Sequence, residues 1–322
     1  MLLNTLLLAG TATATCLHGL SKFKRAEGEV EVNTFGYHGL IGPFNWASLA
    51  EENAPCKSGK VQSPINIDDT IQLATEKPIL NIPEQQFVFE NLATTIEVLA
   101  NGTTSFGGSD FRLRQFHMHT PSEHRIAQEY YPLEIHMVHE GITNPAALVV
   151  IALVFQVSVE ASAPIIAGLT PHFVDIANPG TKTDITKLDL SFLQAHIDAS
   201  DVFQYTGSLT TPPCAEDVSF LLVKEPLPIG VSDFNTIKSI VKFNSRYTQN
   251  SLGEENMLFV GEMSGTDGAL MPPPAAEPPA ESNGTVAAAA MTKGQTITVT
   301  ELGGQPTAVV AVVARKDRKM RG

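Results

Sequence analysis

Hydrophobic and polar residues alternate over several short stretches of the chain, which is the pattern of half-buried β-strands. Residues 111–119 alternate in this way, and residues 133–139 form a second, shorter alternating run. Residues 147–157 and 218–223 are almost wholly apolar, as strands buried on both faces would be. Strand patterns therefore dominate the middle of the chain.

Helical periodicity is less common. Residues 232–243 carry apolar side chains at i, i+3, i+6 and i+7 from Phe234, with Ser232 or Asp233 as the expected N-cap. Residues 164–176 are a second helix candidate. The whole pattern predicts a single β-rich domain with a few peripheral helices.

The first residues have the composition of a targeting region. Residues 1–20 contain an apolar stretch followed by small residues, among them an Ala-Thr-Ala triplet that fits a cleavage site. They are typical of a secretory signal peptide. Residues 21–30 form a leader whose Lys-Arg pair suggests a propeptide cut. The protein is therefore expected to be secreted.

Composition changes again after the domain, which is expected over residues 31–264. Residues 265–322 are rich in Pro and Ala and include the run MPPPAAEPP, which starts at Met271. A Pro-rich segment of this kind stays extended and buries little apolar surface. We therefore expect a low-complexity tail that is disordered.

Composition, charge and the length of the apolar runs exclude three classes of protein. The chain of 322 residues is 43% hydrophobic, which is too apolar for an intrinsically disordered protein. Its formal net charge of −13 is the opposite of what a phosphate backbone attracts. No apolar run approaches the roughly 20 residues that cross a bilayer. We therefore expect neither a nucleic-acid partner nor a membrane span.

Cysteine usage fits export. Of three cysteines, Cys16 would leave with the signal peptide, so the mature chain would carry Cys56 and Cys214. An even pair in a secreted chain favours one disulfide, and two free thiols are the alternative. Asn101 and Asn283 begin Asn-Gly-Thr sequons and are candidate glycosylation sites.

Two histidine-bearing segments carry the candidate chemistry. His117 and His119 lie two residues apart in a predicted strand, so both imidazoles are on one face. If a turn follows, an antiparallel second strand can present His136 to the same point. Three imidazoles with an open fourth position form a catalytic zinc site, whereas structural sites have four protein ligands. Ordinary core histidines are the alternative.

The same alternation places a polar partner beside each strand's histidine. Gln115 shares a face with His117, and Glu134 shares a face with His136. A ligating histidine usually donates its other N–H to a carboxylate or carbonyl oxygen, which fixes its tautomer. Gln115 and Glu134 are therefore expected to orient the metal ligands.

Longer motifs extend this pattern. They read QFHMHTPSEH from Gln115, EIHMVH from Glu134 and YTGSLTTPPC from Tyr205, and shorter FGY and QSPINI motifs precede them. In their order and spacing, over about residues 33–262, they resemble the α-class carbonic anhydrases, in particular exported fungal-like members. The resemblance does not extend to the targeting region or to the Pro-rich tail.

The resemblance implies a mostly β fold: a single domain around a large twisted, mainly antiparallel central sheet with a few short peripheral helices. It implies a zinc lyase that reversibly hydrates carbon dioxide to bicarbonate and a proton by attack of zinc-bound hydroxide. The cofactor would be Zn2+ on His117, His119 and His136. The small-molecule substrate would be carbon dioxide or bicarbonate.

The resemblance also implies roles for further residues. Thr210 would orient the hydroxide, Glu123 would accept the Thr210 proton, and Thr211 would help to hold bicarbonate. Phe220 stands where better-known members carry Trp, which would make that side of the pocket roomier. The apolar residues expected to bind carbon dioxide are Val138, Val150, Leu209 and Phe220.

Two further implications concern the loop after Thr210 and the proton. Exported members pair cysteines that match Cys56 and Cys214, and this bridge would tether the loop that carries Thr210. Many members place a proton-shuttling histidine in the cleft, where alignment here puts Leu92. Leucine cannot exchange a proton, so the transfer must use water chains, buffer or another residue such as His38.

Two other functions compete with this interpretation. The pattern His117-x-His119-x3-Glu123 also fits a cupin-type iron or manganese site, but the later cupin motif is missing. A carbonic-anhydrase-like binding module is the second alternative, although such relatives typically lose a zinc ligand and this chain retains all three. Esterase action would be a side activity of the same site. The sequence does not determine the oligomeric state.

Overall fold

The computed structural model describes residues 30–266. The expected signal peptide, almost all of the leader, Asn283 and the tail beyond Thr266 lie outside the described residues. No helix in the described part is long and apolar enough to cross a membrane. Helix α5 continues to Thr266, beyond the domain end expected at residue 264.

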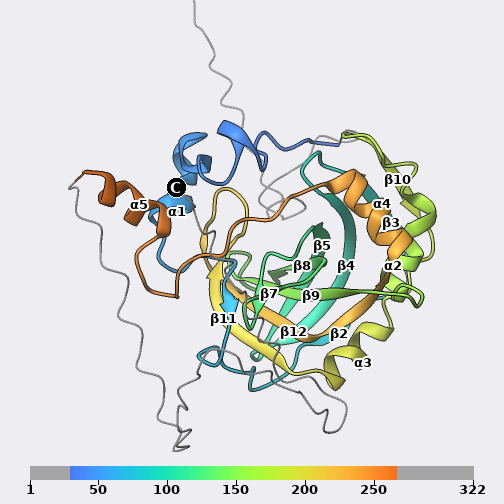
Figure 1. Cartoon of the computed structure of the whole chain (residues 1–322). Coiled ribbons are helices and arrows are strands. Elements are labelled where there is room, and N and C mark those ends of the chain that lie inside the picture. Colours follow the sequence, from blue (N-terminus) through green and yellow to red (C-terminus); the bar gives the residue numbers. More distant parts are fainter. Residues whose placement is uncertain (1–29, 267–322) are drawn as a thin grey trace, which may run out of the picture. The chain divides into compact units, whose positions relative to one another are not determined.

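A nine-stranded sheet forms the body of the domain (Figure 1). Its strand order is β10-β3-β4-β5-β8-β9-β12-β11, and β2 pairs with β4 outside that path. All pairs are antiparallel except β9 with β12, so the expected mainly antiparallel sheet is confirmed. The strands are β2 (Ile79–Asn81), β3 (Phe87–Asn91), β4 (Ile96–Phe106), β5 (Ser109–His119), β8 (Leu133–Gly141), β9 (Leu148–Ser158), β10 (Lys182–Ile185), β11 (Val202–Ser208) and β12 (Glu216–Gly230).

Short elements surround this sheet. A small three-stranded sheet consists of β1 (Asn66–Ile67), β6 (Arg125–Ile126) and β7 (Glu129–Tyr130). The helices are α1 (Pro55–Ser58), α2 (Pro164–Leu169), α3 (Phe192–Ala199), α4 (Val231–Val241) and α5 (Met257–Thr266). The 3-10 turns are η2 (Gly39–Ile41), η3 (Trp46–Ser48), η4 (Glu51–Asn53) and η5 (Thr170–His172).

Every residue of β8 is buried, because both faces of this central strand are covered. Leu133, Ile135 and Met137 point into the main apolar core, together with buried residues of α2, α3 and α4. Alternation sends Glu134 and His136 to the opposite face. The central strands thus separate an apolar layer from a face that carries chemistry.

The predicted helices form with different ends. Helix α4 begins after an extended Gly230 rather than at a Ser232 or Asp233 cap, and it stops where Lys242 adopts a φ of 61°. The segment 164–176 yields only α2 followed by η5, because Pro171 has no N–H to continue the helical hydrogen bonds.

One disulfide joins two distant parts of the chain. Cys56 and Cys214 are bonded at an S–S distance of 2.06 Å, which confirms the expected pairing. Both sulfurs are buried beside Phe35 and Trp46. The bridge connects α1 to the loop between β11 and β12.

Candidate metal centre and active site

Strands β5 and β8 bring the three candidate ligands together. In their antiparallel register His117 lies opposite His136, and His119 lies opposite Glu134. The three imidazoles are buried, and one nitrogen of each lies within 4.8 Å of the others. The convergence expected from the i, i+2 spacing and an antiparallel neighbour is therefore present.

Acceptors around the cluster fix the proton on the outer nitrogen of each ring. His117 Nδ1 donates to the Gln115 side-chain oxygen at 2.8 Å, and His119 Nδ1 donates to the Asn244 carbonyl at 2.9 Å. His136 Nε2 donates to Glu134 Oε1 at 2.7 Å. Because one nitrogen of a neutral imidazole donates and the other accepts, the inner nitrogens keep their lone pairs.

This donor set fits zinc. The inner nitrogen of His119, Nε2, is buried and has no hydrogen-bond partner within the described part of the chain, as expected of an atom that is reserved for a metal. Three neutral imidazoles suit Zn2+, and among residues 30–266 the cluster has no fourth protein ligand, which matches a catalytic rather than a structural site. His117, His119 and His136 are a zinc-binding triad.

Glu134 holds His136 and His124 in place through hydrogen bonds. Its Oε1 accepts hydrogen bonds from His136 and from His124 Nδ1, the latter at 2.6 Å, and its Oε2 accepts from the backbone N–H groups of Glu123 and His124. Burial raises the pKa of Glu134, but its electrostatic interactions and hydrogen bonds with His124 and His136 outweigh burial and hold that pKa well below its usual range. With its oxygens engaged in this way, Glu134 orients ligands instead of binding metal itself.

Glu123 faces the same point from the loop after β5. Its Oε2 lies 3.5 Å from His119 Nε2 and 3.8 Å from His136 Nδ1, and its Oε1 accepts the backbone N–H of Arg246 at 2.8 Å. Burial raises the pKa of Glu123 to about 7, against the lowering effects of His136, the Arg246 N–H and the Thr210 hydroxyl. A dication among the histidines would favour the ionised carboxylate.

The loop after β11 supplies the hydroxyl residues. Thr210 and Thr211 are buried there, and the loop is closed by backbone hydrogen bonds from Leu209 to Ala215 and from Cys214 to Thr211. Val138, Val150, Leu209 and Phe220, the residues expected to bind carbon dioxide, belong to one buried apolar cluster.

The family model for eukaryotic-type carbonic anhydrases matches residues 41–257 of this chain. The chain belongs to the α-carbonic anhydrase family. Its triad is therefore the zinc site of a lyase that interconverts carbon dioxide and bicarbonate.

Individual carbonic anhydrases resemble the chain over most of their own length. The fungal α-carbonic anhydrase of Aspergillus oryzae is 40% identical, with a TM-score of 0.68 over 71% of this chain and 99% of that one. The enzyme of Thermovibrio ammonificans, solved with the inhibitor sulfanilamide, is 30% identical, with a TM-score of 0.62 over 69% and 97%. The carbonic anhydrase of Pectobacterium atrosepticum is 32% identical over 64% of this chain and 83% of its own.

Several residues of this carbonic anhydrase site were not assigned a role from the sequence. His124, Tyr205 and Ser63 stand within the motifs and form a buried chain of hydrogen bonds that ends on Glu134. Asn244 and Arg246 stand outside every motif, in a segment without regular structure. Only the fold brings that segment against β5.

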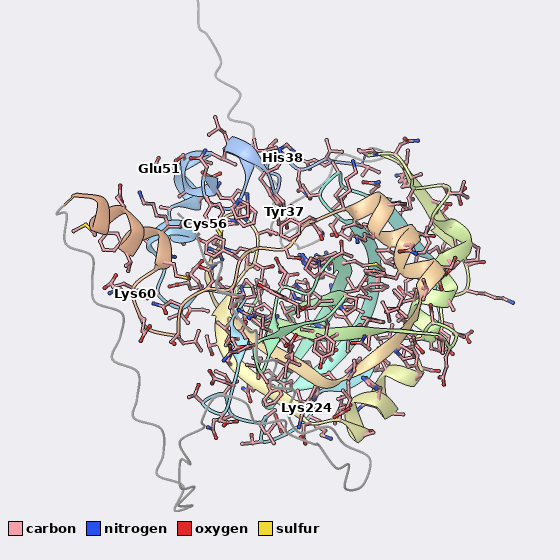
Figure 2. The ribbon with its side chains drawn as sticks, in the orientation of Figure 1. Tyr37, His38, Glu51, Cys56, Lys60 and Lys224 are labelled. Atoms are coloured by element: carbon pink, nitrogen blue, oxygen red, sulfur yellow. A yellow bond between two sulfur atoms is a disulfide. The ribbon has the colours of Figure 1, made fainter. Side chains whose placement is uncertain are left out.

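The remaining sequence-predicted residues lie in contrasting environments. Leu92 is fully buried, whereas His38 is exposed next to η2 (Figure 2). Asn101 is exposed on β4, at the register shift between β4 and β5.

Proposed function

We propose that this protein is an exported carbonic anhydrase in which Thr210 and Glu123 direct the attack on carbon dioxide at the triad. The observation that carries the proposal is the convergence of three imidazole nitrogens whose outer protons are all fixed by acceptors. Zn2+ bound there supplies a Lewis acid that lowers the pKa of water in its open position.

The role of Thr210 and Glu123 is orientation. A carboxylate only accepts hydrogen bonds, and the Thr210 hydroxyl is among the groups that lower the Glu123 pKa, as a donor to the ionised form would. With its proton engaged on Glu123, Thr210 offers the nucleophile only lone pairs. It can then accept one hydrogen bond and fix the direction of attack, and Thr211 next to it would help to hold bicarbonate.

The apolar cluster beside the histidines would bind the substrate. Val138 shares a strand face with His136, and the Phe220 ring centroid lies 5.7 Å from that of His136. Carbon dioxide has no net dipole and gains from contact with such apolar surface. With Phe220 in place of Trp, the wall leaves more room for substrate.

Proton release is the step for which the chain lacks the usual group. Leu92, which aligns with the family's shuttle position, cannot carry a proton. The proton then leaves through water, through buffer, or through a residue such as the exposed His38. Turnover limited by this transfer would depend on buffer.

Export is supported by the disulfide, since such bonds persist in oxidising compartments. The expected signal peptide at residues 1–20 would direct it there. Asn101 is exposed, so its sequon is accessible for glycosylation; Asn283 is the second sequon.

The test is stopped-flow carbon dioxide hydration by the full chain, with zinc measured in the same samples. We expect a chelator and His136→Ala each to abolish activity, and zinc to restore only the chelated wild type. Thr210→Ala should keep its zinc and lose activity by about 100-fold, the scale set by loss of one positioned transition-state group. Full activity of Thr210→Ala would refute the orientation role, and full activity without zinc would refute the zinc mechanism.

A further inference from the structure

Arg246 is a buried cation whose guanidinium donates hydrogen bonds to three neutral oxygens. Its side chain is 1% exposed, and its guanidinium lies over the Trp46 ring at 5.9 Å. Nη1 donates to the Ser63 carbonyl at 2.7 Å, and Nη2 donates to the Gln62 side-chain oxygen at 2.9 Å and the Cys56 carbonyl at 3.1 Å. Only a planar fork with several N–H groups can serve acceptors in this arrangement.

These contacts reach both halves of the disulfide. The Cys56 carbonyl binds Arg246 directly, and the Cys214 carbonyl accepts a hydrogen bond from Gln62 Nε2 at 3.0 Å. Gln62 therefore connects the Arg246 guanidinium to the Cys214 side of the bridge. Figure 2 labels Cys56, the other end of the bridge, in α1. The disulfide alone would fix the position of Cys214 but not the direction of its carbonyl.

The same residue holds the carboxylate of the site. The backbone N–H of Arg246 donates to Glu123 Oε1 at 2.8 Å. Cys214, at the other end of the network, closes the loop that carries Thr210 by donating its N–H to Thr211, and its φ of 58° is a backbone conformation that needs support from its surroundings. Arg246 thus bonds Glu123 directly and reaches the Thr210 loop through Gln62 and Cys56, so it links the two parts of the molecule whose separation sets the Thr210–Glu123 contact.

We infer that Arg246 is a positioning residue for the hydration reaction. Through the Cys56–Gln62–Cys214 network it fixes the position of the Thr210 loop relative to Glu123. The inference rests on the proposed orientation role of Thr210 and Glu123. Arg246 is not one of the zinc ligands. It acts only through the geometry of that pair, and an error of about 1 Å there can cost about 100-fold in rate.

A double-mutant cycle separates this role from a general loss of stability. Arg246→Met keeps an apolar stem and removes the guanidinium. The matched control is Asn256→Ala: Asn256 also donates to the Cys56 carbonyl, but it makes no hydrogen bond to Glu123. Each variant is made in the full chain, in wild-type and Thr210→Ala backgrounds. The measurements are kcat and KM for hydration, zinc content and Tm.

We expect Arg246→Met to lower kcat/KM by about ten- to 100-fold, mostly through kcat, with zinc retained. In the Thr210→Ala background the same substitution should change kcat/KM by less than about threefold, although its effect on Tm persists. Arg246→Lys should resemble Arg246→Met, since one ammonium cannot replace the fork. Asn256→Ala should lower Tm and leave kcat/KM unchanged.

An undiminished effect of Arg246→Met in the Thr210→Ala background would overturn the inference, as would an equal loss of kcat/KM in Asn256→Ala. If Arg246→Met does not fold, Gln62→Met breaks the relay to Cys214 and must show the same non-additivity. A Thr210→Ala variant with full activity would instead remove the proposed orientation role, so the two failures are distinguishable.

Discussion

His139 is a fully buried histidine that the zinc site does not use. It lies on β8 opposite Leu113 and Val149, two residues of the main apolar core. Its Nδ1 donates to the Met137 carbonyl at 2.9 Å, and its Nε2 is also buried. Burial lowers the pKa of His139 from 6.5 to about 4, against a smaller raising effect of backbone hydrogen bonds.

This shift makes the protein less stable in acid. Below about pH 6.5 the unfolded chain binds a proton on His139 that the native state does not bind until about pH 4, so the free energy of unfolding falls as pH falls through this window. The difference between a pKa of 6.5 in the unfolded chain and about 4 in the native state corresponds to about 3 kcal/mol in the free energy of unfolding. About 2 kcal/mol of this stability is lost between pH 7 and pH 5.

Replacing the histidine by an apolar residue should remove this dependence. We expect the stability of His139→Leu relative to the wild type to rise by about 2 kcal/mol between pH 7 and pH 5, whatever its offset at pH 7. The assay is urea unfolding at both pH values with equal zinc loading, followed by the fluorescence of Trp46, the chain's single tryptophan, which is buried. A fully buried reporter should change its emission strongly on unfolding.

Leu113→Ala provides the control, because it damages the same part of the core without a titratable group. Its free energy of unfolding should be about 2–5 kcal/mol below that of the wild type, and this difference should be similar at pH 7 and at pH 5. If His139→Leu and Leu113→Ala show the same pH dependence relative to the wild type, the argument from the buried imidazole is refuted.

Three further outcomes are expected. Replacing both Cys56 and Cys214 by Ala should lower the free energy of unfolding by about 5 kcal/mol in the chain-entropy view, because the bridge closes a separation of 158 residues; a loss below about 1 kcal/mol in urea unfolding would contradict it. If Leu92 occupies the shuttle position, as we propose, stopped-flow kcat should rise with imidazole concentration, and a flat response would mean that the protein contains an efficient shuttle. Phe220→Trp should raise KM for hydration or for a bulkier ester by filling the wall of the apolar cluster, and unchanged KM for both would show that this wall is not in contact with substrate.

Much of the architecture could be predicted from local sequence. Once residues 111–119 are recognised as a strand, the i, i+2 spacing of His117 and His119 places them on one face, and the second alternating run places His136 within reach. The pairing of Cys56 with Cys214 followed from the family resemblance and the cysteine count, and is confirmed. Helix ends were predicted less well, because Gly230 and Lys242 set the limits of α4 through backbone conformations that propensity does not reveal.

What the sequence by itself determined is which histidines are the candidate ligands: the two-residue spacing gives His117 and His119, and the second alternating run with the family resemblance gives His136. What only the tertiary structure decided is the state of each ligand and of its partners. The tautomer of His119 depends on the backbone carbonyl of Asn244, and the orientation of the Glu123 carboxylate depends on the backbone N–H of Arg246. These contacts join residues more than a hundred positions apart, which no local periodicity can encode; packing of the sheet against the segment after α4 creates them.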